Sequence, residues 1–161
     1  MTRKIAVLLL ALLMLMPACA KKAERDISTP EKSLTTLLSA MYLRDADAFI
    51  YCMTDEQLTA YGNSRDSEIK RLKQSMRRTK GKSHPPSEFE ITKRLESKDK
   101  NKVRIEFQLK KEFLKEFDGP GWKGAHIFVK TRDGWKSSGV DVFRDGRWLY
   151  TREDPFKPKY E

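Results

Sequence analysis

The sequence predicts an α+β fold in which N-terminal helices pack on a curved antiparallel β-meander. Apolar residues recur at helical spacing as far as about residue 79, and after Ser87 they alternate with polar residues at a period of two. Two dipeptides that are typical of tight hairpins, Asp133-Gly134 and Asp145-Gly146, separate the last apolar runs. Helices followed by hairpin-connected strands are the pattern of an α+β domain.

The first helix is predicted to begin near Thr29. Ser28 and Glu31 can form a capping box there, or Thr29 can cap a helix with Pro30 in its first position. Apolar residues then recur at helical spacing, at Leu34, Leu37, Leu38, Met41 and Tyr42.

Three shorter helical segments are expected to follow. Asp45 can cap a second helix, and Thr54 with Gln57 predicts a brief third turn that ends at Gly62-Asn63. A fourth helix is expected from Ser64 to about Thr79, with Ile69, Leu72 and Met76 as a narrow apolar stripe.

The strands are predicted from alternation. Phe89, Ile91 and Leu95 form one apolar set, and a second strand has apolar residues at 103, 105, 107 and 109. One face of this sheet is expected to be buried and the other solvated. A long loop over 114–124 is followed by three strands at about 125–131, 135–143 and 147–152, with a bulge or bend at Gly139.

The first nineteen residues have the features of an export signal. Arg3 and Lys4 precede an apolar run, Ile5 to Met16, which is too short to span a bilayer. The sequence Met16-Pro17-Ala18-Cys19 resembles the lipobox of bacterial lipoproteins. This resemblance implies cleavage after residue 18, acylation of Cys19 and stable attachment to a membrane.

The expected organisation has four parts. Residues 1–18 are the signal peptide, 19–28 the lipidated cysteine and a tether, 29–152 the α+β domain and 153–161 an irregular tail. The resemblance places the protein in the cell envelope, and Ala20 favours the periplasmic side of the outer membrane if the cell is Gram-negative. An ordinary cleaved signal and an uncleaved membrane anchor are the alternatives.

Charge and cysteine content restrict the partners. The formal net charge of +10 falls to about +8 without Arg3 and Lys4, which favours anionic lipid or another anionic envelope polymer over nucleic acid, for which no binding motif exists. Cys52 lies in an apolar run and is expected in the core. The two histidines, His84 and His126, form no metal-ligand spacing with the cysteines, so no metal or cofactor is expected.

The domain resembles small bacterial lipoproteins with a nuclear-transport-factor-2-like, cystatin-like domain. The likeness covers most of residues 29–152 and lies in Thr29-Pro30-Glu31, the first helix, the junction 44–49 and Asp145-Gly146-Arg147-Trp148. Arg44 stands where that family usually has glycine. The resemblance implies a cone-shaped cavity between helix and sheet, which is a common place for a ligand.

Two interpretations of that cone remain open. Its expected lining either surrounds a small apolar ligand or fills the core: Tyr42, Phe49, Phe107, Ile127, Val129 and Trp148. Enzymes of the same superfamily, of the ketosteroid isomerase or dehydratase type, place an acid or base inside the cone. His126 and Asp141 are the candidates here, with Tyr42 or Tyr51 as donors, although alternation is expected to turn His126 outward.

The segment 65–82 is the most basic part of the surface. Its predicted helix has basic residues beside the apolar stripe, namely Lys70, Arg71, Lys73, Arg77 and Arg78. This helix either lies on an anionic bilayer or packs its stripe on the sheet.

A further possibility is that tryptophan side chains stack on sugars or peptides of the envelope; the chain has three, Trp122, Trp135 and Trp148. The function expected is thus a non-enzymatic, lipid-anchored envelope protein that binds a protein partner or a small apolar ligand, with an enzyme as the alternative.

Overall fold

A computed structural model describes residues 21–59, 64–78, 84–116, 123–144 and 147–149. Four helices open this part of the chain: α2 (Pro30–Leu43), α3 (Ala46–Tyr51), α4 (Asp55–Leu58) and α5 (Arg65–Arg78). A short 3-10 turn, η1 (Pro86–Glu88), leads into the strands β1 (Phe89–Glu96) and β2 (Lys102–Leu109). A second, η2 (Lys111–Glu116), precedes β3 (Lys123–Thr131), β4 (Gly134–Arg144) and β5 (Arg147–Leu149).

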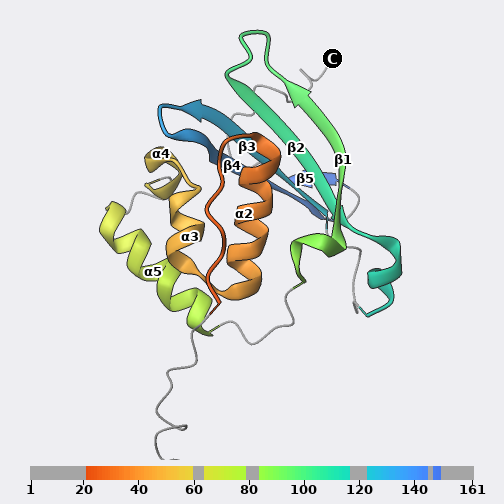
Figure 1. Cartoon of the computed structure of the whole chain (residues 1–161), viewed down its shortest axis with the longest axis horizontal. Helices are drawn as coiled ribbons and strands as arrows, with labels where there is room; N and C mark the ends of the chain where they lie inside the picture. Colours follow the sequence, from red (N-terminus) through yellow and green to blue (C-terminus); the bar gives the residue numbers. More distant parts are fainter. Residues whose placement is uncertain (1–20, 60–63, 79–83, 117–122, 145–146, 150–161) are drawn as a thin grey trace, which may run out of the picture.

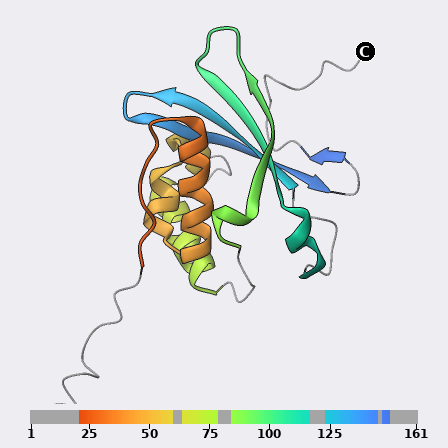
Figure 2. The ribbon, with the colours of Figure 1, turned by 45° about the vertical axis from the view of Figure 1, so that its right-hand side comes forward.

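The five strands form one antiparallel sheet in the order of the chain, β1-β2-β3-β4-β5. The sheet curves, and the helices lie on one side of it (Figures 1 and 2). The predicted α+β class, with N-terminal helices on an antiparallel meander, is confirmed. The bulge expected near Gly139 is also present, because Ile127 pairs with Gly139 whereas Phe128 pairs with Ser137, so that one residue of β4 is skipped.

Side-chain caps fix where the helices begin. The hydroxyl of Thr29 accepts a hydrogen bond from the Lys32 amide at 3.2 Å, so Thr29 and not Ser28 caps α2. Asp45 caps α3 and Thr54 caps α4, as their spacing predicted. Arg44, at the end of α2, adopts the left-handed conformation (φ 57°), which explains why glycine is favoured at such a position.

The core lies between α2 and the sheet. Its buried residues come from the apolar stripe of α2 and from one face of β2 and β3, with Ile27 and Cys52 beside them: Ile27, Leu34, Leu37, Leu38, Cys52, Val103, Ile105, Phe107 and Phe128. Phe49, Phe89 and Trp135 pack against this set from its margins. Burial of the helical stripe against alternate strand residues is the contact that fixes α2 on the sheet.

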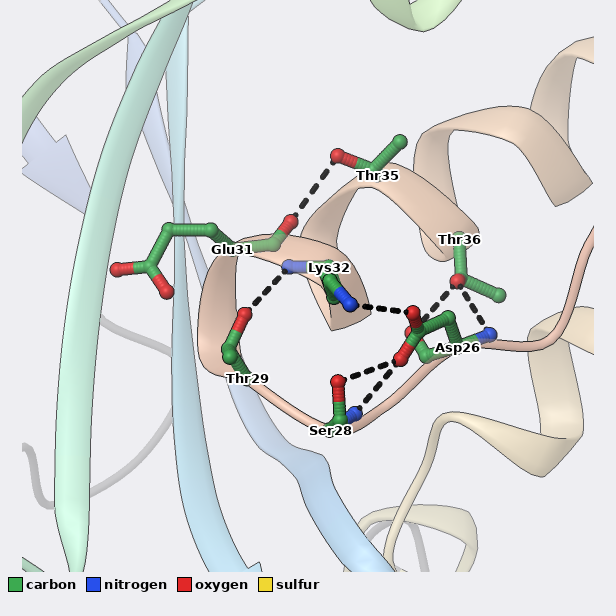
Figure 3. Close-up of polar contacts among 7 residues, drawn as sticks. All are labelled: Asp26, Ser28, Thr29, Glu31, Lys32, Thr35 and Thr36. Carbon is green, nitrogen blue, oxygen red and sulfur yellow. Dashed lines mark hydrogen bonds and ion pairs between the residues drawn. The ribbon is translucent and has the colours of Figure 1, made fainter.

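The segment 21–28 is fastened to the domain. Ile27 and Ala23 are buried, and the carbonyl of Ile27 accepts a hydrogen bond from the Trp135 amide at 2.8 Å, as a strand neighbour would. The backbone of Asp26 exchanges two hydrogen bonds with the Thr36 hydroxyl, at 3.2 and 2.9 Å (Figure 3). The sequence predicted a tether here, and the structure instead places residues 21–28 along α2.

The Asp26 carboxylate reinforces this attachment. It pairs with Lys32 at 2.8 Å and accepts two hydrogen bonds from Ser28 (Figure 3). The bond from Lys32, followed by those from Ser28, lowers the pKa of Asp26 to about 2. Asp26 therefore remains ionised in any ordinary buffer, and the segment keeps its bond to the first turn of α2.

Candidate functional site

The five residues predicted to line the cone whose side chains the structure describes do not share one cavity. Phe107 is 1% exposed and belongs to the packed core, which Phe49 borders. Tyr42 lies on the surface with 42% of its area exposed. The side chain of Trp148 lies outside the described part of the chain. The remaining two, Ile127 and Val129, alternate with the core residue Phe128 and so lie on the opposite face of the sheet.

His126 lies inside the domain, contrary to the outward orientation expected from alternation. Its ring stacks on Phe107, with centroids 5.8 Å apart, and lies equally close to Phe128. The prediction correctly put His126 and Phe128 on one face, but it is this face that the helices cover. Burial lowers the pKa of His126 to about 4, so the ring is neutral at pH 7, and Nδ1 lies 2.9 Å from the Ser137 hydroxyl.

The other face of the sheet holds a buried ion cluster. Arg104 and Asp141 are 4% and 1% exposed, and their Nε and Oδ2 atoms lie 3.4 Å apart. Glu106 is buried beside them and forms a second ion pair with Arg104. The sequence predicted a solvated face at Arg104 and Glu106, and that prediction is wrong: charges that pair with one another can be buried on a face that alternation marks as polar.

The two predicted acid–base candidates are not brought together. His126 pairs with Val140 across the β3–β4 ladder, whereas Asp141 is the next residue and pairs with Ala125. Successive strand residues point to opposite faces, so His126 and Asp141 lie on different sides of the sheet. Asp141 contacts Arg104 instead, and its chemistry is that of an ion pair.

A groove of about 730 Å³ opens between the N-terminal segment, α3, α4 and the β3–β4 hairpin. It is lined by apolar, hydroxyl and charged side chains: Arg25, Asp47, Ile50, Tyr51, Met53, Thr54, Asp55, Glu56, Arg65, Val129, Thr131 and Lys136. Val129, predicted to line the cone, lies in this groove together with Tyr51, which was predicted as a hydrogen-bond donor.

Tyr51 is the most distinctive residue of the groove. Its ring, 37% exposed, lies 5.6 Å from the Arg25 guanidinium carbon and 5.7 Å from the Lys136 ammonium nitrogen. Both distances are within the range of cation–π attraction. One aromatic ring thus holds two cations from distant parts of the chain next to the apolar side chains of Ile50 and Met53.

Several other charges of the groove are paired. Asp55 accepts a hydrogen bond from Arg65 Nε at 2.7 Å, and Asp47 pairs with Lys73 at 2.8 Å. The pair with Lys73 lowers the pKa of Asp47. Lys136 also lies 3.4 Å from Asp133, and Glu56 adds a further acid to the lining. The groove is therefore mixed in charge, and its cations meet apolar side chains at Tyr51, where an anionic group that lies over apolar surface fits.

Helix α5 packs against α3 and α4, and its predicted stripe, Ile69, Leu72 and Met76, is half-buried. The five basic residues predicted on this helix differ in their surroundings. Lys73 and Arg71 are engaged, by Asp47 and by the buried Glu68 respectively. The remaining three are exposed, namely Lys70, Arg77 and Arg78. Arg71 and Arg78 also border a shallow hollow of about 380 Å³ with Gln74 and Ser75.

Cys52 is buried, as its apolar neighbours predicted, and burial raises the pKa of its thiol to about 12. Among the residues that the structure describes, no three His, Cys, Asp or Glu side chains are grouped so that they could hold a metal ion. No helix within the described ranges has the length and apolar character needed to cross a bilayer. Cys19 and Trp122 lie outside the described residues, and Trp135 packs against the core.

No model of a protein family and no curated protein matches this chain. Two solved structures resemble it. One is an NTF-2 like protein of unknown function from Shewanella oneidensis MR-1, with 15% identity, a TM-score of 0.43, and coverage of 68% of this chain and 91% of the other. The second is a protein of unknown function with a cystatin-like fold from Methylobium petroleophilum PM1, with 14% identity, a TM-score of 0.42, and coverage of 87% and 86%.

Proposed function

We propose that this chain is a non-enzymatic, lipid-anchored protein of the bacterial cell envelope that binds a small ligand or a partner in the groove beside Tyr51. The anchor is Cys19, in the lipobox-like sequence Met16-Pro17-Ala18-Cys19. Ala20 favours the periplasmic side of the outer membrane in a Gram-negative cell. The ligand is a molecule, or a segment of a partner, that combines apolar surface with an anionic group.

The placement of Arg25 and Lys136 about the Tyr51 ring is the observation that supports this proposal most. The two cations come from the N-terminal segment and from β4, and they meet beside apolar side chains of α3 and the residues after it. An anion placed near both cations gains attraction, while its apolar part covers Ile50, Met53 and Val129. The cone offers less room, because Phe107 and Phe128 fill the space between α2 and the sheet.

Native mass spectrometry of the protein, gently extracted from its own membranes, tests both parts of the proposal. A mature mass that begins at Cys19 and includes acyl chains is expected, together with a retained small molecule or partner. An unmodified Cys19 would contradict the anchor. An acylated protein that retains neither a small molecule nor a partner would contradict the binding role.

Two variants locate the binding site. Tyr51→Ala is expected to abolish retention of the bound species, because it removes the ring that positions both cations. Ile91→Ala is the control, since Ile91 is also exposed but belongs to β1 and does not line the groove. Equal retention by wild type and Tyr51→Ala would place the binding site elsewhere.

A further inference from the structure

The attachment of residues 21–28 restricts where the domain can lie relative to an anchor at Cys19. The amide of Ala23 donates to the Asp45 carboxylate at 3.2 Å, and the Ala23 side chain is buried. Four residue steps separate Cys19 from Ala23, and a fully extended chain spans about 14 Å over them. If Cys19 carries lipid, as the proposed function states, the domain must therefore touch the membrane.

This short link determines which end of the domain faces the membrane. The described chain begins beside the last turn of α2 and the end of α5, and the β1–β2 turn lies at the opposite end (Figures 1 and 2). The contacts agree, because Lys22, Arg25 and Lys73 are all close enough to Asp47 to lower its pKa, with Lys73 as the main cause. The anchored end thus brings together residues from three separate segments.

The exposed side chains at this end suit the surface of an anionic bilayer. Five of them are basic and come from the chain start, the end of α2 and the end of α5: Lys21, Lys22, Arg44, Arg77 and Arg78. Two large apolar side chains in the last turn of α2, Met41 and Tyr42, are also exposed. Tyrosine is enriched where a protein meets lipid head groups, because its ring is apolar and its hydroxyl is polar.

The nearby acids offset only part of these charges. Asp47 is balanced by Lys73, whereas Asp45 accepts hydrogen bonds from the neutral amides of Ala23 and Ala48 and so keeps its negative charge. Asp45 and the exposed Glu24 together supply two negative charges against the five basic residues. The end therefore keeps an excess of positive charge.

We infer that this anchored end, defined by Lys21, Lys22, Met41, Tyr42, Arg44, Arg77 and Arg78, is a docking surface for an anionic lipid bilayer. The lipid chain supplies attachment, and the docking surface supplies orientation, because it holds the last turns of α2 and α5 against the head groups. Each basic residue near an anionic surface strengthens binding by roughly fivefold.

Binding to vesicles without the lipid anchor tests the docking surface. The mature chain from residue 19, with Cys19→Ser, is mixed with vesicles that contain anionic phosphatidylglycerol or with vesicles of phosphatidylcholine alone. The double variant Arg77→Glu/Arg78→Glu is expected to bind the anionic vesicles at least 25-fold more weakly, at about fivefold for each basic residue removed.

A control with the same change in net charge separates location from total charge. Lys98→Glu/Lys102→Glu places the reversals by the β1–β2 turn, at the far end of the domain. The affinity of this variant for anionic vesicles is expected to fall by only about twofold, because exposed charges more than a Debye length from the bilayer are screened. Equal losses in both double variants, or equal binding of wild type to the two kinds of vesicle, would overturn the docking surface.

A third variant tests the apolar part of the docking surface. Tyr42→Ser is expected to weaken binding to anionic vesicles by about tenfold, because a tyrosine ring contributes to burial in the interface. An unchanged affinity would show that Tyr42 is not part of the docking surface.

The modification state of Cys19 in cells distinguishes the two proposals. If Cys19 is found unmodified while the vesicle results hold, the lipid anchor fails and the docking surface stands.

Discussion

The two faces of strand β2 are both buried, but by different chemistry. The face that α2 covers has Val103, Ile105 and Phe107 from β2, whereas the opposite face has Arg104 and Glu106 from the same strand. On the first face, packing removes apolar area from water. On the second, ions must satisfy one another because water is excluded. The comparison shows that the same alternation can describe a strand with two buried faces.

The histidine and the arginine make the contrast sharper. His126, on the helix-covered face, is kept neutral because burial disfavours its charged form. Arg104 cannot lose its proton, and its burial depends on the carboxylates of Glu106 and Asp141. The apolar face can thus lose an individual polar contact at moderate cost, whereas the ionic face depends on every member of its cluster.

The largest effect is expected from breaking the ion cluster. Arg104→Met leaves two buried carboxylates without their common cation, and the free energy of unfolding is expected to fall by about 3–5 kcal/mol. Urea denaturation at pH 7 measures this. The triple variant Arg104→Met/Glu106→Gln/Asp141→Asn should recover part of the loss, since it leaves no buried charge. A loss below about 1 kcal/mol for Arg104→Met would show that the cluster is hydrated.

Acidification is expected to act on the helix-covered face. The pKa of His126 is about 4 in the folded chain and 6.5 for an ordinary histidine, so the unfolded chain binds more protons between these values. The contribution of neutral His126 to the free energy of unfolding is therefore complete above about pH 6.5 and is lost as the pH falls toward 4. The difference between the two pKa values corresponds to about 3 kcal/mol.

Unfolding free energies measured from pH 7 to pH 4 test this linkage. His126→Gln should remove the slope between pH 6.5 and 4 that His126 contributes, because glutamine does not titrate. His84→Gln is the control, since His84 lies outside the core cluster and contacts Glu88. The same slope in wild type and His126→Gln would mean that His126 reaches solvent in the folded protein.

The smallest effect compares one glycine from each face. A methyl group on Gly124 would lie 3.1 Å from Phe107 Cζ, which is tighter than an ordinary contact, whereas one on Gly139 would lie 3.7 Å from Ile127 Cδ1. Gly124→Ala is expected to cost about 1 kcal/mol and Gly139→Ala less than about 0.5 kcal/mol. Thermal denaturation of both variants would measure this, and a reversed order would show that the helix-covered face is the looser one.

Local signals explain what the sequence could predict. The caps at Thr29, Asp45 and Thr54 act over three residues, and each was recognisable from spacing alone. The hairpin at Asp133-Gly134 is equally local. The antiparallel meander could be predicted because hairpin-connected strands pair with their neighbours in the chain.

The burial of β2 on both sides could not be predicted in this way. Alternation states which side chains share a face, and it contains no information on what covers that face. Arg104 and Glu106 resemble any solvated pair until the register brings Asp141 close to them. The same limit explains His126, whose companions on its face were predicted correctly and whose burial was not.

The N-terminal segment and the groove were missed because their contacts join distant residues. Only Ala23 and Ile27 of the segment 21–28 are buried, and two apolar residues among many charges indicate a solvated tether. The groove requires Arg25 and Lys136 to meet at Tyr51. No local pattern connects these three residues. The one signal in the sequence was Tyr51 itself, an aromatic residue at the end of a short predicted helix.

Methyl NMR with a simple amphipathic anion tests most directly whether binding occurs in the groove rather than in the cone. Octanoate combines a carboxylate with an apolar chain and is titrated into protein with labelled isoleucine and valine methyl groups. Shifts are expected at Ile50 and Val129, which line the groove, and none at Ile105, which lies in the core. Shifts at Ile105 with none at Ile50 would place the ligand between α2 and the sheet and contradict binding in the groove.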